Sequence, residues 1–357
     1  MPIEIGKISS LFSCIIVPLM TRVFLALYSV SSRAVCGLKS GLVRRKILKP
    51  RKAPIPVISV GNLTLGGSEK TPLVMELISY IEGLGFKPAL VSRGYRGAWE
   101  KSGGILSDGK TVLGSWEQAG DEPVLVAHRF PKTGVFVGKN RYRSCQKARD
   151  LGFDVAILDD GFQHIRLGRD LDIVLHDDRS PSAVREGFPA LRRADILLWK
   201  TGGRGARLDQ IRRKCPDLAI FKYRMISKGF RGLGSGQEIP YAALKGREIF
   251  AFCGIARPGR FFALLEESGL TLKARTSFPD HFSYPLQALR RLNAAYRESG
   301  AKALVTTEKD AVKLDSRDGS FSQLPVYVLR IGLDLPEAFF DRVRDRLPRH
   351  EETRPSK

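Results

Sequence analysis

The sequence predicts an α/β protein: a doubly wound parallel sheet with a phosphate-binding loop, a second, smaller α/β domain and an N-terminal interfacial helix. Three observations predict this fold class. Apolar, strand-like runs alternate with helical patterns from residue 54 onward, and such alternation gives βαβ units and a parallel sheet. A Gly-Gly turn joins the first of these runs to a helical pattern. A largely apolar N-terminal stretch precedes a cluster of basic residues.

Residues 1–50 are expected to form an amphipathic membrane anchor and a basic segment. The run 11–30 is largely apolar, but Pro18 interrupts it and Arg22 places a charge near its centre, whereas a spanning helix needs about twenty apolar residues without charge. The basic residues that follow are Arg33, Lys39, Arg44, Arg45, Lys46, Lys49, Arg51 and Lys52. Each adds about 1 kcal/mol of attraction to an anionic leaflet. An interfacial helix is therefore favoured over a helix packed on the protein's own core, and a single membrane span comes third.

Two α/β domains are expected to follow, over residues 51–228 and 229–347, with a polar tail over 348–357. A polar, Gly-rich stretch at 226–248 marks the boundary. The expected strands of the first domain, several of them apolar on both faces as in a parallel sheet, are 54–60, 88–94, 133–138, 154–160, 172–178, 194–200 and 218–224. The second domain is expected to contain strands at 249–255, 302–307 and 325–331 and helices near 258–268 and 285–299.

The stretch VISVGNLTLGGSEKTP (57–72) reads as a strand, a phosphate-binding loop and the start of a helix. Backbone N–H groups at a helix N-terminus bind phosphate. Lys70 would bridge the outer phosphates of a nucleotide, and the Thr71 hydroxyl would ligate Mg²⁺. The usual pattern has glycine where this chain has Thr64 and Glu69. A Gly-Gly turn that feeds a helix, with Ser68 or Thr71 as its cap, is the alternative.

Three carboxylates stand at the ends of predicted elements. The run DVAILDDGFQH ends an apolar strand in Asp159 and Asp160, as strands that hold Mg²⁺ near phosphates do. Neighbouring side chains on a strand point to opposite faces, so one of the two is expected to face the metal. Asp121, in QAGDEPVLVAH, stands where a helix begins. It serves either as the N-cap or as a general base toward a substrate hydroxyl.

Two loops carry further polar residues. SRGYRG presents Arg93, Tyr95 and Arg96 between glycines, which suits binding of a phosphate or sugar, although a solvated turn is equally compatible. FPDHFSYP places His281 beside Asp280 in the second domain. A lone histidine is usually structural, but this segment has neither helical nor strand periodicity, which favours a functional role.

The charge balance favours anionic partners. The chain has 59 Lys+Arg against 37 Asp+Glu, a net charge of +22, and such a field attracts nucleic acid, an anionic membrane or a phosphorylated substrate. The sequence shows no interleaved aromatic and basic residues of the kind that bind single strands, and no helix-turn-helix pattern. A nucleic-acid partner is therefore not expected, and a basic P-loop protein that binds nucleic acid is the least favoured alternative.

Eight segments, taken together and in this order, resemble the tetraacyldisaccharide 4′-kinase family of lipid A biosynthesis. They run from residue 53 to about residue 314 and are APIPVISVGNLTLGGSEKTP, LVSRGYRG, AGDEPVL, VGKNRY, ILDDGFQH, GIARPGRFF, FPDHFSY and TTEKDAVKL. The resemblance implies a membrane-associated P-loop kinase at the cytoplasmic face of the bacterial inner membrane. Such an enzyme transfers the γ-phosphate of ATP to the 4′-hydroxyl of a tetraacyl glucosamine disaccharide 1-phosphate and forms lipid IVA.

The same resemblance implies the roles of the site residues. Asp121 is the base for the 4′-hydroxyl, and His281 supports it across the domain cleft. The residues implied to bind ATP are Thr64, Leu65, Gly66, Gly67, Ser68, Glu69, Lys70 and Thr71. Those implied to hold Mg²⁺ are Thr71, Asp159 and Asp160. Those expected to bind the anionic acylated substrate are Arg93, Tyr95, Arg96 and Arg185. No obligate protein partner is inferred.

This chain departs from the family pattern at two places. The family has glycine where Glu69 stands, and if that position needs a positive φ, glutamate costs roughly 1–2 kcal/mol more than glycine. The Glu69 carboxylate would then repel phosphate, turn outward or pair with Lys70. The segment 176–195 is also shorter than the family's insert, and only Arg185-Glu186 clearly remain of it. A degenerate kinase homologue that binds the lipid but turns over ATP weakly is therefore the alternative function.

Overall fold

The computed structural model describes residues 29–32, 34–38, 41–43, 45–64, 69–177, 184–202, 206–314, 321 and 324–348. The expected anchor over 11–30 lies outside this part of the chain except for Ser29 and Val30, which begin a short helical stretch. Phosphate-loop residues 65–68 also lie outside it. Within the described ranges, every helix is too short or too polar to cross a membrane.

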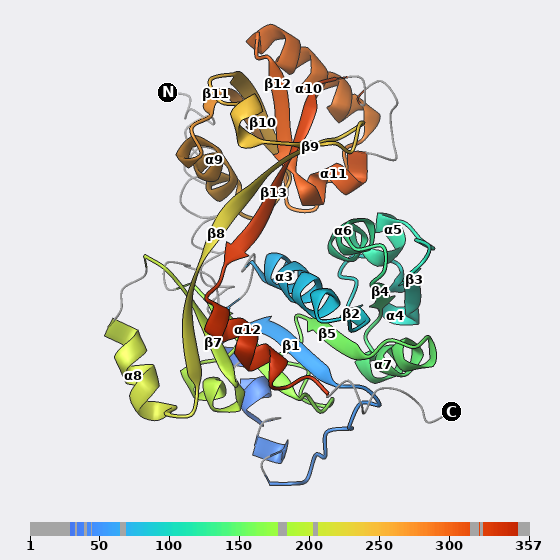
Figure 1. Cartoon of the computed structure of the whole chain (residues 1–357), viewed down its shortest axis with the longest axis vertical. Coiled ribbons are helices and arrows are strands. Elements are labelled where there is room, and N and C mark those ends of the chain that lie inside the picture. The colour runs from blue at the N-terminus through green and yellow to red at the C-terminus, as the bar shows by residue number, and fades with distance from the viewer. Residues whose placement is uncertain are drawn as a thin grey trace, which may run out of the picture.

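A single sheet joins the strands of the described residues (Figure 1), in the order β11-β10-β12-β13-β8-β7-β6-β1-β5-β2-β4-β3, with β9 paired to β8. The strand bounds are β1 Val57–Asn62, β2 Pro88–Ser92, β3 Gly104–Asp108, β4 Gly134–Val137, β5 Val155–Asp159, β6 Leu171–His176, β7 Ile196–Lys200, β8 Ala219–Gly232, β9 Glu238–Ile239, β10 Glu248–Cys253, β11 Thr271–Ser277, β12 Ala303–Thr307 and β13 Val326–Asp334. Each strand expected from the sequence has a counterpart among them.

The sheet consists of two parallel halves joined by one antiparallel pair. Strands β8, β7, β6, β1, β5, β2 and β4 run parallel, with β3 antiparallel at the edge. Strands β13, β12, β10 and β11 run parallel in the second half. Strand β13 pairs antiparallel with β8, where the two halves meet. The predicted α/β class with a large, mostly parallel sheet is confirmed.

Helices cover both faces of each half, as a doubly wound sheet requires. Their bounds are α3 Lys70–Gly83, α4 Trp99–Ser102, α5 Trp116–Ala119, α6 Asp121–Arg129, α7 Arg141–Asp150, α8 Ala206–Lys214, α9 Pro258–Glu267, α10 Leu286–Ser299, α11 Glu308–Leu314 and α12 Glu337–Arg344. Apolar residues of α3, α6 and α12 share one core, and those of α7 and α8 belong to cores on the opposite face. In the second half, α10 and α9 cover opposite faces.

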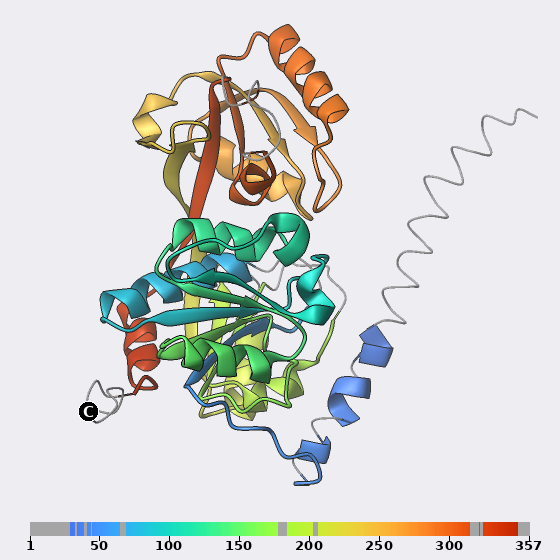
Figure 2. The same cartoon turned by 90° about the vertical axis from the view of Figure 1, so that its right-hand side faces the viewer.

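The link between the domains differs from the expected loop boundary. The chain enters the second domain along β8, a strand of 14 residues that contains position 229, and leaves it along β13 (Figure 1). Helix α12, which the sequence placed in the second domain, packs on the first, where Phe339 contacts Phe221. Figure 2 shows both strands running from one domain into the other. The expected boundary between residues 228 and 229 therefore falls inside a strand that crosses between the domains, rather than in a loop.

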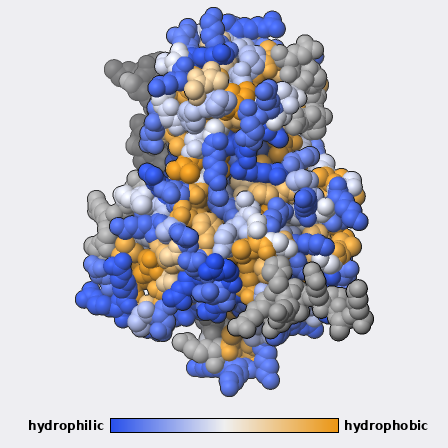
Figure 3. Space-filling view, viewed as in Figure 1, coloured by the Kyte–Doolittle hydropathy of each residue, from blue (hydrophilic) through white to orange (hydrophobic). Residues whose placement is uncertain are grey.

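The surface in the view of Figure 3 is mostly hydrophilic, with apolar residues in separate patches. Near the N-terminus several apolar side chains are exposed, namely Val30, Val35, Leu38 and Ile47. They stand in the same short segment as the basic residues Arg45, Lys46 and Lys49.

Candidate active site

A cavity of about 610 Å³ lies between the two domains, at the carboxyl ends of the first domain's parallel strands. In doubly wound sheets ligands bind at this edge, beside the strand where the chain reverses its winding direction. Here that strand is β1, which has β5 on one side and β6 on the other. The charged residues that line the cavity are Glu69, Lys70, Arg93, Asp121, Glu122, Asp159, Asp160, Arg185, Arg257, Arg260, Asp280, His281, Glu308 and Lys309.

Lys70 begins helix α3 and points toward the ends of two neighbouring strands. Its Nζ lies 3.0 Å from Oδ1 of Asp160 and 3.5 Å from Oδ1 of Asn62. Thr71 follows in the first turn and is buried. The described end of the loop therefore brings an ammonium and a hydroxyl to the helix N-terminus, where phosphate is favoured.

Glu69 has the left-handed backbone conformation that the family's glycine at this position suggested. Its φ is 62°, a region that costs a non-glycine residue roughly 1–2 kcal/mol. The carboxylate neither faces solvent nor pairs with Lys70, so both of those expectations are wrong. It pairs instead with Lys200 at the end of β7 and with Arg260 of α9, 3.3 Å away. Burial and the nearby Glu69 raise the pKa of Tyr223 well above its ordinary value.

Asp159 and Asp160 have different surroundings. Asp159 ends β5, is buried, and its Oδ1 has no hydrogen-bond partner among the described residues. Burial, followed by the charge of Glu122, raises the pKa of Asp159 to about 7. Asp160 has a φ of 54° and pairs with Lys70 and, through both carboxylate oxygens, with Arg185 at 2.9 and 2.7 Å. Burial raises the pKa of Asp160, but the two cations outweigh it and hold that pKa well below its usual range.

These oxygens fit a magnesium site. The described residues contain no group of three or more His, Cys, Asp and Glu side chains that could hold a metal, but Mg²⁺ usually takes one or two carboxylates and keeps water and phosphate as its other ligands. The unpartnered Oδ1 of Asp159 is the free acceptor that such an ion needs. The Thr71 hydroxyl and Asp160 line the same cavity and supply further hard oxygen donors.

Asp121 and His281 meet across the cleft. Gly120, with a φ of 90°, precedes helix α6 and is its N-cap, so Asp121 is the first helical residue rather than the cap. Oδ2 of Asp121 lies 2.9 Å from Nδ1 of His281, and Nζ of Lys313 lies 3.5 Å from the same oxygen. Burial raises the pKa of Asp121, but the hydrogen bond from His281 and the charges of Lys309 and Lys313 hold that pKa well below its usual range. The hydrogen bond to Asp121 raises the pKa of His281.

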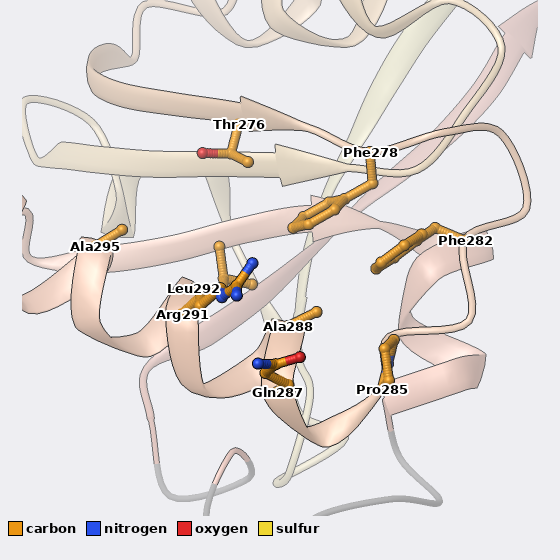
Figure 4. Close-up of a pocket in the computed structure, with 9 residues that line it drawn as sticks. All are labelled: Thr276, Phe278, Phe282, Pro285, Gln287, Ala288, Arg291, Leu292 and Ala295. Atoms are coloured by element: carbon orange, nitrogen blue, oxygen red, sulfur yellow. The ribbon is translucent and has the colours of Figure 1, made fainter.

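The histidine loop also borders a second cavity on its other side. This cavity, of about 450 Å³, lies against helix α10. Figure 4 shows the stacked rings of Phe278 and Phe282 on one side of it and Leu292 on the helix opposite. His281 has a φ of 62° and Tyr284 a φ of 51°. Such strain in non-glycine residues persists only where the surroundings hold it, and it clusters at functional sites.

The four residues expected to bind substrate have different positions. Arg93 lines the cavity and its Nε donates to Glu100 at 2.9 Å. Tyr95 also lines the cavity and contacts His281 edge-on, with 5.9 Å between ring centroids. Arg96 does not belong to the lining, and its Nη1 donates across the cleft to the carbonyl of Asp280 at 3.2 Å. Arg185 lines the cavity while bound to Asp160.

Several charged residues of the cleft were not predicted as site residues from the sequence. Lys309, in helix α11, pairs with Glu122 in the first turn of α6, and Arg260, in α9, pairs with Glu69 and Asp177. Their segments, TTEKDAVKL and GIARPGRFF, entered the sequence argument only as part of a resemblance. The sequence did contain a signal for them, because each segment follows a strand of the parallel second half of the sheet. Ligand-binding residues gather at the carboxyl edge of such strands.

Comparisons with known proteins identify the family of this chain. A model of the family described as tetraacyldisaccharide-1-P 4′-kinase matches residues 21–348. A tetraacyldisaccharide 4′-kinase from Geobacter metallireducens is 40% identical over 300 residues, covering 81% of this chain and 88% of that protein. The one from Pelobacter propionicus is 38% identical over 301 residues, covering 82% and 81%. The crystal structure of LpxK from Aquifex aeolicus in complex with ATP has a TM-score of 0.72 and 30% identity, covering 92% of this chain and all of that one.

Proposed function

This chain belongs to the tetraacyldisaccharide-1-phosphate 4′-kinase family, and from that premise we propose that the cleft between its domains is the active site. The chain is an ATP-dependent kinase that phosphorylates the 4′-hydroxyl of a tetraacyl glucosamine disaccharide 1-phosphate in lipid A biosynthesis. The observation that carries the site assignment is the contact of 2.9 Å between Asp121 and His281, which come from different domains and line the same cavity as Lys70.

Lys70 and Thr71 act at the nucleotide end of the cleft. The Lys70 ammonium contacts the outer phosphates, for which it exchanges part of its pairing with Asp160. Thr71, Asp159 and Asp160 would hold Mg²⁺. When bound, the ion would supply positive charge that offsets the charge of the phosphates. Arg185, already bound to Asp160, keeps that carboxylate ionised.

Asp121 acts at the acceptor end. Its Oδ2 accepts the hydrogen bond of the 4′-hydroxyl and orients the hydroxyl oxygen toward the γ-phosphorus. A carboxylate whose pKa is held low is a weak base, but phosphoryl transfer depends more on positioning and charge than on early proton removal. The hydroxyl proton therefore moves to Asp121 late in the transfer. His281 holds the carboxylate in place and offsets its charge.

We also propose that the N-terminal segment meets the cytoplasmic face of the bacterial inner membrane. The exposed apolar residues Val30, Val35, Leu38 and Ile47 support this, since apolar side chains next to basic ones favour an anionic bilayer surface. Ser29 accepts a hydrogen bond from the Val184 amide at 3.1 Å, and Ser32 donates one to the Arg185 carbonyl at 3.2 Å. A membrane-bound segment would thus lie close to the acceptor cleft. Sedimentation with anionic liposomes tests the contact, with neutral liposomes as the control.

A direct assay tests the function. Purified protein, Mg-ATP and the tetraacyl disaccharide 1-phosphate in detergent should give a 4′-phosphorylated product, detected by mass spectrometry. Asp121→Ala and Lys70→Ala should each abolish the product. Full turnover by either variant would refute the role of that residue, and absence of product with the wild type would refute the function. Binding of the lipid without turnover would instead identify the degenerate homologue that Glu69 suggested.

A further inference from the structure

Helices α11 and α6 pack against each other across the cleft (Figure 1). Three ion pairs of the described residues cross this contact: Glu308–Arg129 at 2.6 Å, Lys309–Glu122, and Lys313–Asp121 at 3.5 Å. In all three, the residue of the second domain belongs to α11 and its partner to α6. The pairs form only when the two domains lie this close together.

Lys309 differs from the other two cations in where its charge lies. It belongs to the described lining of the cavity, whereas Arg129 and Lys313 do not. The Lys313 side chain is only 1% exposed and lies behind Asp121, 3.5 Å from Oδ1 of Asp310. Among the three cations of the helix contact, Lys309 is therefore the one that a ligand in the cleft can touch.

The Lys309 ammonium lines the cavity and pairs with Glu122, the residue next to Asp121. Burial lowers the pKa of Lys309, but the charges of Glu122, Asp121 and Asp159 outweigh it and raise that pKa above its ordinary value, so the ammonium stays protonated. The same charge lowers the pKa of Asp121 and opposes the rise in the pKa of Asp159. The pair with Glu122, next to Asp121, places the Lys309 ammonium at the acceptor end of the cleft.

The acceptor side of the cleft needs such a cation. Asp121 and Glu122 stand together there, Asp159 lines the same cavity, and a transferred phosphoryl group adds negative charge between them. Other cations of the lining pair with carboxylates away from Asp121: Lys70 with Asp160, Arg93 with Glu100 and Arg260 with Glu69 and Asp177. The carboxylate that holds Lys309, Glu122, directly follows Asp121 in the chain. In phosphoryl transfer the protein's main contribution is to place positive charge where the phosphoryl oxygens move.

We propose that Lys309 is a catalytic residue that contacts the transferred phosphoryl group and is supplied by the second domain when the cleft closes. The inference rests on the proposed function. In the reaction the oxygen of the 4′-hydroxyl forms a bond to the γ-phosphorus as the bond from phosphorus to the β–γ bridging oxygen breaks. ADP leaves with the electrons of that bond, and the hydroxyl proton goes to Asp121. Lys309 makes no covalent bond and donates hydrogen bonds to the phosphoryl oxygens.

The test compares Lys309→Ala, Lys309→Gln and Lys309→Arg in the full chain. Loss of a charge that acts mainly on the transition state lowers kcat about 10²–10³-fold. We expect that loss in the alanine and glutamine variants, partial recovery in the arginine variant, and a Kd for ADP within about threefold of wild type. Binding of ADP with aluminium fluoride, which imitates the phosphoryl group in flight, should weaken in step with kcat.

Arg129→Gln is the matched control, because it breaks an ion pair of the same helix contact at a residue that does not itself line the cavity. If Lys309 only held the domains together, this variant would lose as much kcat as Lys309→Ala, and the proposal would be overturned. Turnover within threefold of wild type in Lys309→Gln would overturn it too. Circular dichroism checks that each variant is folded. If Lys309→Ala does not fold, the turnover of Lys309→Gln tests the proposal. A wild-type enzyme that gives no product would remove the proposed function and this inference together.

Discussion

Replacing Glu69 with glycine should make the protein less stable although it relieves backbone strain. Glycine removes a cost of roughly 1–2 kcal/mol at a φ of 62°. It also leaves Lys200, only 9% exposed, without its carboxylate, and breaking a buried ion pair costs about 3–5 kcal/mol. Arg260 keeps Asp177 as a partner, so the orphaned charge is that of Lys200. The net effect is a loss of about 1–4 kcal/mol of unfolding free energy.

Urea unfolding followed by tryptophan fluorescence measures this loss, since Trp199 is buried next to Lys200. The double variant Glu69→Gly with Lys200→Met is the control, because it removes the orphaned charge while keeping a side chain of similar length. It should recover most of the lost stability. A single variant as stable as wild type, or a double variant no more stable than the single one, would refute the account of the Glu69 pairing.

The same substitution should strengthen nucleotide binding. Losing one negative charge leaves a surplus positive charge near the phosphates, worth about 2 kcal/mol at roughly 8 Å and an effective dielectric of 20. Titration calorimetry with a non-hydrolysable ATP analogue should show a Kd up to about 30-fold lower. Stability and affinity thus change in opposite directions. An unchanged Kd would mean that Lys200 and Arg260 already neutralise Glu69.

Three further predictions concern the catalytic carboxylates and the histidine. Asp121→Asn should lower kcat by about 10²–10⁴-fold and leave the KM for ATP within about threefold of the wild-type value. A large change in the KM for ATP with an unchanged kcat would contradict the acceptor-side role of Asp121. Because Asp121 raises the pKa of His281 above 6.5, the stability that this pair adds is fully present below pH 6.5 and is lost as pH rises through the folded value. The difference in unfolding free energy between wild type and His281→Gln should therefore be larger at pH 6 than at pH 9, and the reverse order would contradict the pairing. Because the pKa of Asp159 is about 7, Mg²⁺ competes with a proton there, and the Mg²⁺ concentration for half-maximal activity should rise as pH falls from 8 to 6. Asp159→Asn should abolish that pH dependence while raising the Mg²⁺ requirement about tenfold or more.

Much of the first domain could be predicted from residue patterns. Strands β1, β5 and β6 are mostly apolar because both faces of a central parallel strand are buried. Asp159 ends β5 and Asp160 follows it, so both stand at the carboxyl edge of the sheet. The domain crossing was harder, since β8 has a mixed burial pattern along its 14 residues that resembles neither a core strand nor a linker.

The pairings that complete the site were beyond pattern reasoning. Asp121 and His281 are 160 positions apart, and Glu69 lies 131 positions from Lys200 and 191 from Arg260. Local periodicity reports which face of an element is buried, but it does not report which distant charge that face meets. Family resemblance supplied the first of these pairs, and only coordinates supplied the others, because glycine at position 69 would have no side chain to pair.

The antiparallel contact of β8 with β13 limits how this enzyme can admit its acceptor. The two strands form one hydrogen-bonded ribbon, so the second domain is not joined to the first by a flexible linker. Opening of the cleft therefore requires the ribbon to twist. The ladder is irregular between Leu329 and Ile331, two residues that also face the cavity. Twisting costs least where pairing is already interrupted, so the part of the ribbon that deforms most easily is also part of the cavity wall.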